Sequence, residues 1–174
     1  MFLSKDQDMP IDNQPSRYSS LGKDMLARAT AEDCQVFGSF FLSRLLGFEI
    51  SYETFERAPH RGSSEQENAS ICVVRFEAVP PLFNPQGTLH GGILATALDI
   101  SMGHLLHRVD AAGATLEMKV QYLAPITAGF VRCEGTFLRQ GKSICAMQSS
   151  AFRADGKLAA HATATWKIAR SLQR

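Results

Sequence analysis

The fold is decided by the stretch LFNPQGTLHGGILATALDISMGHLLHR, residues 82–108. From Gly91 to Leu106 almost every residue is apolar or small, which is typical of a helix buried on all sides. Such a helix has only about four turns, so it is too short to cross a membrane and suits a protein core. We therefore expect a central helix with a sheet wrapped around it.

The segments on both sides of this helix alternate in polarity or are rich in β-forming residues, which indicates strands. The expected strands are residues 48–57 and 69–79 before the helix, and 115–123, 130–139, 142–152 and 158–168 after it. The first two are expected to form a hairpin across a polar turn at 60–68. The short connections between the last four favour an antiparallel meander. The expected fold class is α+β, an antiparallel sheet of about six strands around one helix.

The N-terminal part is expected to contain a polar tail and helices. Residues 1–20 are polar and are expected to be a flexible tail, so that the domain spans residues 21–170. A first helix is expected to begin after Ser19 or Ser20.

A second helix is expected to begin at Thr30, which would form an N-capping pair with Asp33, and to end at Gly47. Its apolar face is expected to form walls of a binding pocket. The residues expected there are Phe37, Phe40, Phe41 and Leu45.

Composition restricts the class of protein. The 174 residues are 45% hydrophobic and have a net charge of +1, which suits one domain and argues against a general binder of polyanions. The four cysteines lack CxxC spacing and are expected to be free thiols. No run of about 18 apolar residues and no signal-peptide pattern is found, so a cytoplasmic location without a membrane span is expected.

Asp99 lies in the middle of the apolar helix, where a carboxylate must be compensated or must do chemistry. Bracing a neighbouring backbone is the alternative role. His90, Gly91 and Gly92 stand at the helix start, where free amides favour a carbonyl oxygen that gains negative charge. Asn84 precedes them on a turn. This combination indicates an acyl-transfer site, and burial is expected to raise the pKa of Asp99.

Other catalytic signatures are weak or absent from the sequence. His104 and His107 are three residues apart, but no third ligand accompanies them, so no metal site is expected. The sequence contains no G-x-S-x-G motif of serine hydrolases. The run Gly141-Lys142-Ser143 lacks the glycine-rich loop of a phosphate-binding motif and suits a hairpin turn.

The pattern Asn84-Pro85-x-Gly87-x-x-His90-Gly91-Gly92, with Asp99 in the following helix, resembles the signature of the hotdog-fold acyl-CoA thioesterases. The most similar branch is the phenylacetyl-CoA thioesterase-like group. Residues 115–125 and 139–143 are also similar to that group. The resemblance covers roughly residues 40–168.

The resemblance implies hydrolysis of acyl-CoA to a free acid and CoA. The Gly91 amide would polarise the thioester carbonyl, and Asn84 would hold the substrate or water. His90 would position the carbonyl or assist the leaving thiolate. Asp99 of the opposite protomer would act as general base or as nucleophile, with Thr115 orienting the water.

The remaining candidates concern substrate binding and assembly. The residues expected to contact the substrate are Phe83, Gly92, Arg139, Gly141, Lys142 and Ser143. Arg139 and Lys142 would meet CoA phosphates, and the alternative is that they are solvated turn residues. The resemblance implies a homodimer with interfacial sites, paired further into a tetramer. No cofactor, metal or nucleic acid is expected. Two other functions stay open: a non-catalytic acyl-CoA binding or sensing module, and a hotdog dehydratase.

Overall fold

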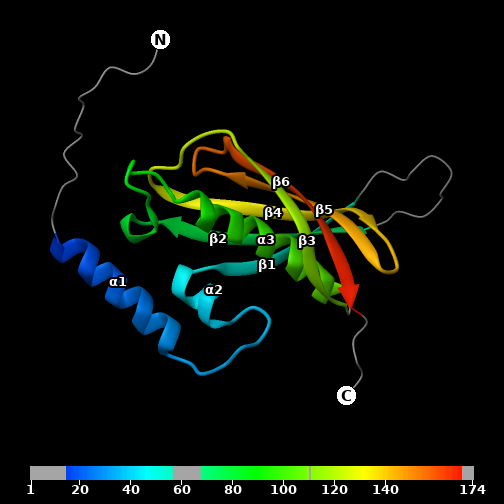
Figure 1. Ribbon diagram of the computed structural model, residues 1–174, viewed down its shortest axis with the longest axis horizontal. Coiled ribbons are helices and arrows are strands. Elements are labelled where there is room, and N and C mark those ends of the chain that lie inside the picture. The colour runs from blue at the N-terminus through cyan, green and yellow to red at the C-terminus, as the bar shows by residue number, and fades with distance from the viewer. Residues whose placement is uncertain (1–14, 57–67, 110, 170–174) are drawn as a thin grey trace, which may run out of the picture.

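The computed structural model describes residues 15–56, 68–109 and 111–169, so the first 14 residues of the expected tail and most of the expected turn at 60–68 lie outside the described residues. The elements are α1 (Pro15–Thr30), α2 (Phe41–Leu46), β1 (Glu49–Glu56), β2 (Asn68–Ala78), η1 (Pro80–Leu82), α3 (Gly91–Arg108), β3 (Ala112–Tyr122), β4 (Gly129–Gln140), β5 (Ile144–Phe152) and β6 (Leu158–Ala169) (Figure 1). The expected α+β fold class is confirmed.

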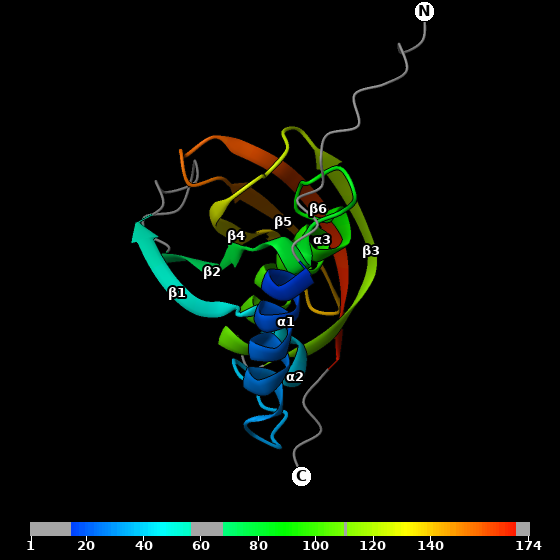
Figure 2. The same cartoon turned by 90° about the vertical axis from the view of Figure 1, so that its left-hand side faces the viewer.

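The six strands form one antiparallel sheet in the order β1-β2-β4-β5-β6-β3. The sheet curls around α3, as the end-on view shows (Figure 2). Leu98, Met102 and Leu105 of α3 are fully buried among the core residues. The predicted central helix is therefore confirmed, and its apolar surface is covered by the concave face of the sheet.

The helix touches the sheet most closely at Gly135 of β4. A Cβ atom built on Gly135 would lie only 2.3 Å from the carbonyl oxygen of Ser101 in α3. Beside this contact, the buried hydroxyls of Ser101 and Ser149 hydrogen-bond each other at 2.7 Å. The absence of a side chain at position 135 lets the helix backbone lie directly on the sheet.

The prediction that the last four strands form a meander is wrong for the first of them, β3. β4, β5 and β6 are successive neighbours, but β3 pairs with β6 at the far edge, and β4 pairs with β2. The burial of the strands explains the difference. β4 buries Val131, Cys133 and Gly135 at alternate positions, as a central strand does, whereas β3 is exposed along most of its length, with Leu116 59% exposed.

The prediction of a helix from Thr30 to Gly47 is also wrong in its extent. Thr30 is the last residue of α1, and its hydroxyl donates to the carbonyl oxygen of Leu26 instead of capping a new helix. Residues 31–40 form a loop, and only Phe41–Leu46 is helical. The Arg44 guanidinium stabilises this loop by donating to the carbonyl oxygens of Glu32 and Cys34. The expected end is confirmed, since Gly47 adopts φ 68° and caps α2.

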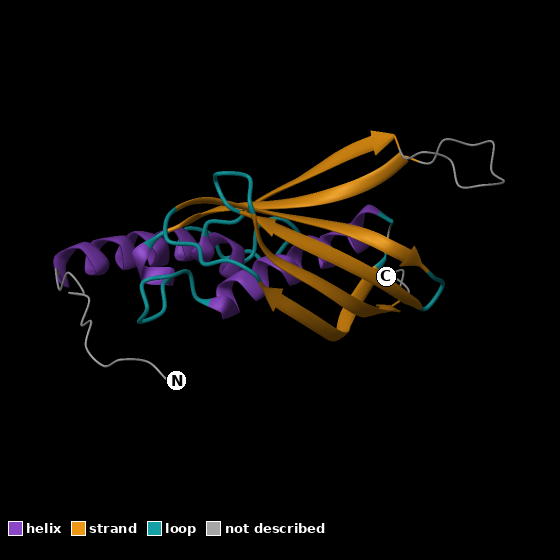
Figure 3. Ribbon diagram, turned by 90° about the horizontal axis from the view of Figure 1, so that it is seen from above, coloured by secondary structure: helices purple, strands orange, loops and turns teal. Residues whose placement is uncertain are grey.

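The N-terminal helix begins earlier than expected. α1 starts at Pro15, a residue favoured in the first helical turn, rather than after Ser19 or Ser20. It packs against α2 and η1, with Ala29 fully buried. Figure 3 shows that α1 extends the molecule beyond one end of the sheet.

The cysteines within the described residues are free. Cys72, Cys133 and Cys145 are buried and Cys34 is half-buried, as expected for thiols that fill the core. No helix in the described ranges has the length and apolar character needed to cross a membrane.

Candidate active site

Asp99 is a half-buried carboxylate in the middle of α3. The Thr115 hydroxyl of β3 donates a hydrogen bond to its Oδ1 atom at 2.8 Å. Burial raises the pKa of Asp99 as expected from the sequence, while the hydrogen bond from Thr115 opposes that rise. The carboxylate is therefore more basic than an ordinary aspartate and is fixed in orientation, as a general base requires.

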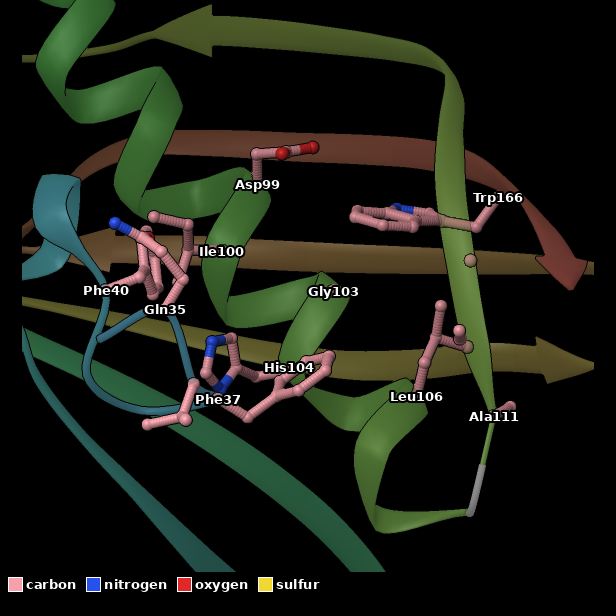
Figure 4. A pocket seen from close by; sticks show the side chains of 13 residues that line it. Gln35, Phe37, Phe40, Asp99, Ile100, Gly103, His104, Leu106, Ala111 and Trp166 are labelled. Carbon is pink, nitrogen blue, oxygen red and sulfur yellow. The ribbon is translucent and has the colours of Figure 1, made fainter. Parts of the chain in front are cut away.

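Asp99 opens onto a cavity of about 380 Å³ with mostly apolar and aromatic walls (Figure 4). The walls come from the loop before α2, from α3, from the start of β3 and from β6. The lining residues are Gln35, Val36, Phe37, Phe40, Asp99, Ile100, Gly103, His104, Leu106, Ala111, Ala112, Gly113 and Trp166. Phe37 and Phe40 line this cavity as expected, whereas Phe41 and Leu45 are not among its walls.

The loop that supplies Phe37 and Phe40 is held by Arg44. Its guanidinium donates to the carbonyl oxygens of Ala29, Glu32 and Cys34 at 2.9–3.1 Å. Three backbone acceptors, one at the end of α1 and two in the loop, suit the planar fork of donors of arginine. Sequence reasoning missed Arg44, because a cation within an apolar segment reads as a solvated residue.

His104 and His107 contact the aromatic wall rather than a metal. The Phe37 ring stacks on His107, with centroids 4.5 Å apart, and meets His104 edge-on at 5.3 Å. His104 is buried, its Nδ1 atom lies 3.3 Å from the Tyr52 hydroxyl, and burial lowers its pKa. Within the described residues, no three His, Cys, Asp or Glu side chains are placed to hold a metal ion.

The start of α3 is built by His90. His90 is the N-cap, and its Nδ1 atom accepts the Gly92 amide at 2.9 Å. The Gly92 amide is therefore already used inside the helix cap. The Gly91 amide has no acceptor among the described residues, so it is the donor that remains available at the positive end of the helix.

Tyr122 was not singled out from the sequence, yet it packs against this helix start. Its hydroxyl donates to the Gly91 carbonyl oxygen at 2.9 Å, and its ring would lie 3.2 Å from a Cβ atom on Gly91. Gly91 thus lets the helix start approach the aromatic ring. The alternating pattern of the strand offered no signal for this contact, which depends on how β3 passes the helix.

Asn84 organises the turn that precedes the helix. Its Oδ1 atom accepts the backbone amides of Gln86 and Thr88, and its Nδ2 atom donates to the Thr88 hydroxyl. Phe83, half-buried next to it, forms an isolated bridge with Leu89. Asn84 and Gly91 both line a second cavity of about 320 Å³, which Tyr122 also borders.

The two cavities belong to different parts of α3. Gly91 precedes Asp99 by eight residues, which places their backbones about 12 Å apart along the helix. One thioester carbonyl cannot lie within hydrogen-bond distance of both the Gly91 amide and the Asp99 carboxylate of the same chain. The structure therefore joins Asp99 with Thr115, and Asn84 with Gly91, but keeps these pairs apart within one protomer.

The residues expected to bind CoA phosphates lie elsewhere. Arg139 lies at the end of β4, and Gly141, Lys142 and Ser143 form the turn between β4 and β5. Arg139 lies ten residues, about 30 Å of strand, along β4 from Gly129. Gly129 pairs with Ala78, which precedes η1 and the turn of Asn84, so Arg139 is at the other end of β4. Arg139 and Lys142 are exposed, and no ion pair to them is found among the described residues.

Comparison with known proteins shows what the core of this chain is similar to. The family model described as the thioesterase superfamily matches residues 86–160, which include the start of α3, Asp99 and Thr115. Residues 86–160 are thus similar to the thioesterase superfamily. The fold agrees, because six antiparallel strands around a central helix form the hotdog fold of the thioesterase structures that the chain resembles.

Two curated relatives come from Saccharolobus solfataricus, and both are provisionally named esterases. One is 38% identical over 87 residues, which cover 49% of this chain and 62% of the relative. The other is 30% identical over 86 residues, which cover 48% of this chain and 57% of the relative. The chain thus matches about six-tenths of the length of these two relatives.

Solved structures extend the similarity over more of the chain. A Bacillus halodurans protein crystallised with CoA has a TM-score of 0.67 and 24% identity, with 98% of this chain and 99% of that one covered. A Ralstonia eutropha protein, provisionally described as a thioesterase related to phenylacetic acid degradation, has a TM-score of 0.59 and 25% identity, with coverage of 83% and 99%. The similarity of fold therefore extends over the N-terminal helical part as well as the sheet.

Proposed function

We propose that this protein hydrolyses acyl-CoA thioesters to a free acid and CoA. The observation that carries the proposal is the basic, half-buried Asp99 carboxylate, held by Thr115 on the wall of an aromatic cavity. The cavity would take the acyl group. The Bacillus halodurans structure with CoA supports the choice of CoA as the thiol, since it has the same fold over nearly the whole chain.

The catalytic site would form between two protomers. The separation of about 12 Å along α3 calls for a Gly91 amide and an Asp99 carboxylate from different chains. The exposed edge strand β3, which presents Leu116 and Tyr122 to solvent, offers backbone groups and apolar surface for pairing with a second copy. Thr115 lies on this same strand, so pairing there would bring the partner close to Asp99.

In the proposed reaction, the Asp99 carboxylate takes a proton from water, and the resulting hydroxide forms a C–O bond with the thioester carbon. The Gly91 amide of the other protomer stabilises the negative oxygen of the intermediate. The C–S bond then breaks, and the CoA thiolate leaves and is protonated by Asp99 or solvent. No cofactor beyond the CoA of the substrate is needed.

The other candidates have supporting positions in this scheme. His90 fixes the helix start through Gly92, and its second ring nitrogen is left for the carbonyl or the leaving thiolate. Asn84 uses its side chain within its own turn, so its part in the site is to shape the cavity beside Gly91. Phe83 supports the same turn.

The CoA phosphates would be bound by Arg139 and Lys142, with Gly141 and Ser143. This requires that the end of β4 and the following turn of one protomer lie beside an active site that contains residues of the other protomer. Charge reversal at both cations should then raise KM more than it lowers kcat. An unchanged KM would assign both to ordinary solvated positions.

The experiment that tests the function is release of free thiol from a panel of acyl-CoAs, for the parent and for Asp99→Asn. We expect kcat of the variant to fall at least about 100-fold while the oligomer stays intact. Asp155→Asn, on an exposed turn, is the matched control and should retain the parent rate. Tight binding of acyl-CoA without thiol release would instead indicate a sensing module, and hydration or dehydration of the acyl chain would indicate a dehydratase.

A further inference from the structure

The peptide group between Gly91 and Gly92 is bound at both ends by side chains. Its carbonyl oxygen accepts the Tyr122 hydroxyl at 2.9 Å, and its N–H donates to His90 Nδ1 at 2.9 Å. A peptide between two glycines has unusual rotational freedom, because neither neighbour carries a Cβ atom. The two side chains therefore restrain the part of the helix start whose own backbone is least restrained.

Each of the two glycines makes room for one of these side chains. A Cβ atom on Gly91 would lie 3.2 Å from Tyr122 Cζ, and one on Gly92 would lie 3.1 Å from His90 Nδ1. Neither glycine has a positive φ, so the backbone conformation does not itself require glycine. The close approach of the two rings explains why a helix begins with two residues that are poor helix formers.

An irregularity in β3 brings Tyr122 to the helix together with Thr115. The two residues are seven positions apart, an odd spacing that puts side chains on opposite faces of a regular strand. A shift of register against β6, between Thr115 and Glu117, removes this difference. The cross-strand partners of the two residues, Trp166 and Ala160, are both buried in the core. Both hydroxyls therefore reach α3 from one strand.

The restrained peptide determines which nitrogen of His90 carries hydrogen. Because Nδ1 accepts the Gly92 N–H, the neutral ring has its hydrogen on Nε2, which is then a donor. A donor suits both roles proposed for this nitrogen, a hydrogen bond to the carbonyl oxygen or to the leaving thiolate. The hydrogen bond from Tyr122 polarises the same peptide and so strengthens its donation to Nδ1.

We propose that Tyr122 is a positioning residue for hydrolysis, which acts on His90 through the peptide between Gly91 and Gly92. This inference rests on the proposed thioesterase function. The tyrosine hydroxyl donates to the peptide oxygen, the peptide N–H donates to Nδ1, and the ring is held with Nε2–H free for the substrate. Tyr122 gives up no proton in this scheme.

The test removes the hydroxyl of Tyr122 and keeps its ring. Tyr122→Phe is compared with the parent and with protein that carries 4-aminophenylalanine at position 122, which keeps a donor near the place of the hydroxyl. Gln121→Ala is the matched control, because Gln121 is the neighbouring exposed residue of β3 and lines neither cavity. Tyr122 is 54% exposed in one protomer, so the oligomeric state of each protein is measured as well.

We expect kcat of Tyr122→Phe on acyl-CoA to fall about fivefold, the effect of losing one neutral hydrogen bond, with KM within about twofold of the parent. The 4-aminophenylalanine protein should recover most of this loss, and the control should match the parent. In the His90→Ala background, Tyr122→Phe should lower kcat less than about twofold, because the tyrosine acts through that ring.

Amide hydrogen exchange separates this role from a general loss of stability. The Gly92 N–H should exchange about fivefold faster in Tyr122→Phe, whereas the Leu98 amide in the middle of α3 should keep its parental rate. Faster exchange throughout α3 with a lower Tm would indicate a merely structural role. Loss of the oligomer would assign Tyr122 to the interface. Either result overturns the inference.

The kinetic outcomes can also overturn it. An unchanged kcat in Tyr122→Phe, or an equal loss with and without the His90 ring, would show that Tyr122 does not act on His90. A loss that 4-aminophenylalanine does not recover would show that the donor is not its cause. If the parent releases thiol and Asp99→Asn does not, these results bear on Tyr122 alone. If the parent releases no thiol from any acyl-CoA, the proposed function and this inference both fail.

Discussion

Replacement of Gly135 by alanine tests whether the helix that carries Asp99 lies directly on the sheet. The new Cβ atom would be 2.3 Å from the Ser101 carbonyl oxygen, 2.4 Å from its carbonyl carbon and 2.8 Å from the Met102 nitrogen. All three are backbone atoms of α3, so no side-chain rotation relieves the overlap. Ordinary contact distances require the helix to move away from β4 by about 1 Å.

The cost of this movement can be worked from the contacts that it disturbs. Overpacking of a well-packed core costs about 1–3 kcal/mol. Stretching the buried hydrogen bond between Ser101 and Ser149 costs about 1–3 kcal/mol more. The gain from replacing a strand glycine is under about 1 kcal/mol. We expect the free energy of unfolding to fall by about 2–5 kcal/mol, and Tm to fall by roughly 10 °C.

The same movement should affect catalysis, because Asp99 lies two residues before Ser101. A displacement of about 1 Å in a reacting group can lower the rate about 100-fold. Thermal unfolding and acyl-CoA hydrolysis are measured together at a temperature where the variant is folded. Gly22→Ala in α1 is the control, since nothing lies within 4 Å of its Cβ position, and it should raise stability by about 0.5–1 kcal/mol. A Gly135→Ala protein with parental Tm and kcat would refute the close contact and the reasoning built on it.

Three further predictions concern the site. Thr115→Val removes the hydrogen-bond donor that opposes the rise in the pKa of Asp99. The acid limb of the plot of kcat/KM against pH should therefore move to higher pH, and kcat at neutral pH should fall about tenfold. Thr115→Ser keeps the hydroxyl and should keep the parental profile. Asp99 has a raised pKa in the folded state, so its contribution to stability is full at low pH and is lost as pH rises through that raised value. Asp99→Asn should therefore raise Tm at pH 7 and change it little near pH 3, and a lower Tm at pH 7 would contradict this sign. Phe37→Ala removes an aromatic wall and should raise KM about fivefold with little change in kcat, as judged against Phe41→Ala, which does not line the cavity.

The sequence by itself determined the elements whose cause is local. An apolar run of helical length predicted the central helix, and period-two alternation with glycine and proline turns predicted all six strands. The left-handed cap at Gly47 followed from glycine chemistry. The carboxylate inside the apolar helix could also be identified directly, because a charge in such a place has few structural uses.

Tertiary structure alone decided what depends on contacts between distant segments. The edge position of β3 could not be predicted from its alternating polarity. The order of the strands depends on which faces of α3 the sheet still has to cover. The loop at 31–40 replaced a helix because Arg44, some ten residues away in sequence, binds its carbonyl groups. Two contacts depend on the register of β3 with β6 and on the distance of α3 from the sheet. They are the hydrogen bond between Thr115 and Asp99 and the packing of Trp166 against Gly103. Local propensity carries no information on either quantity, since both are set by the packing of side chains across the core.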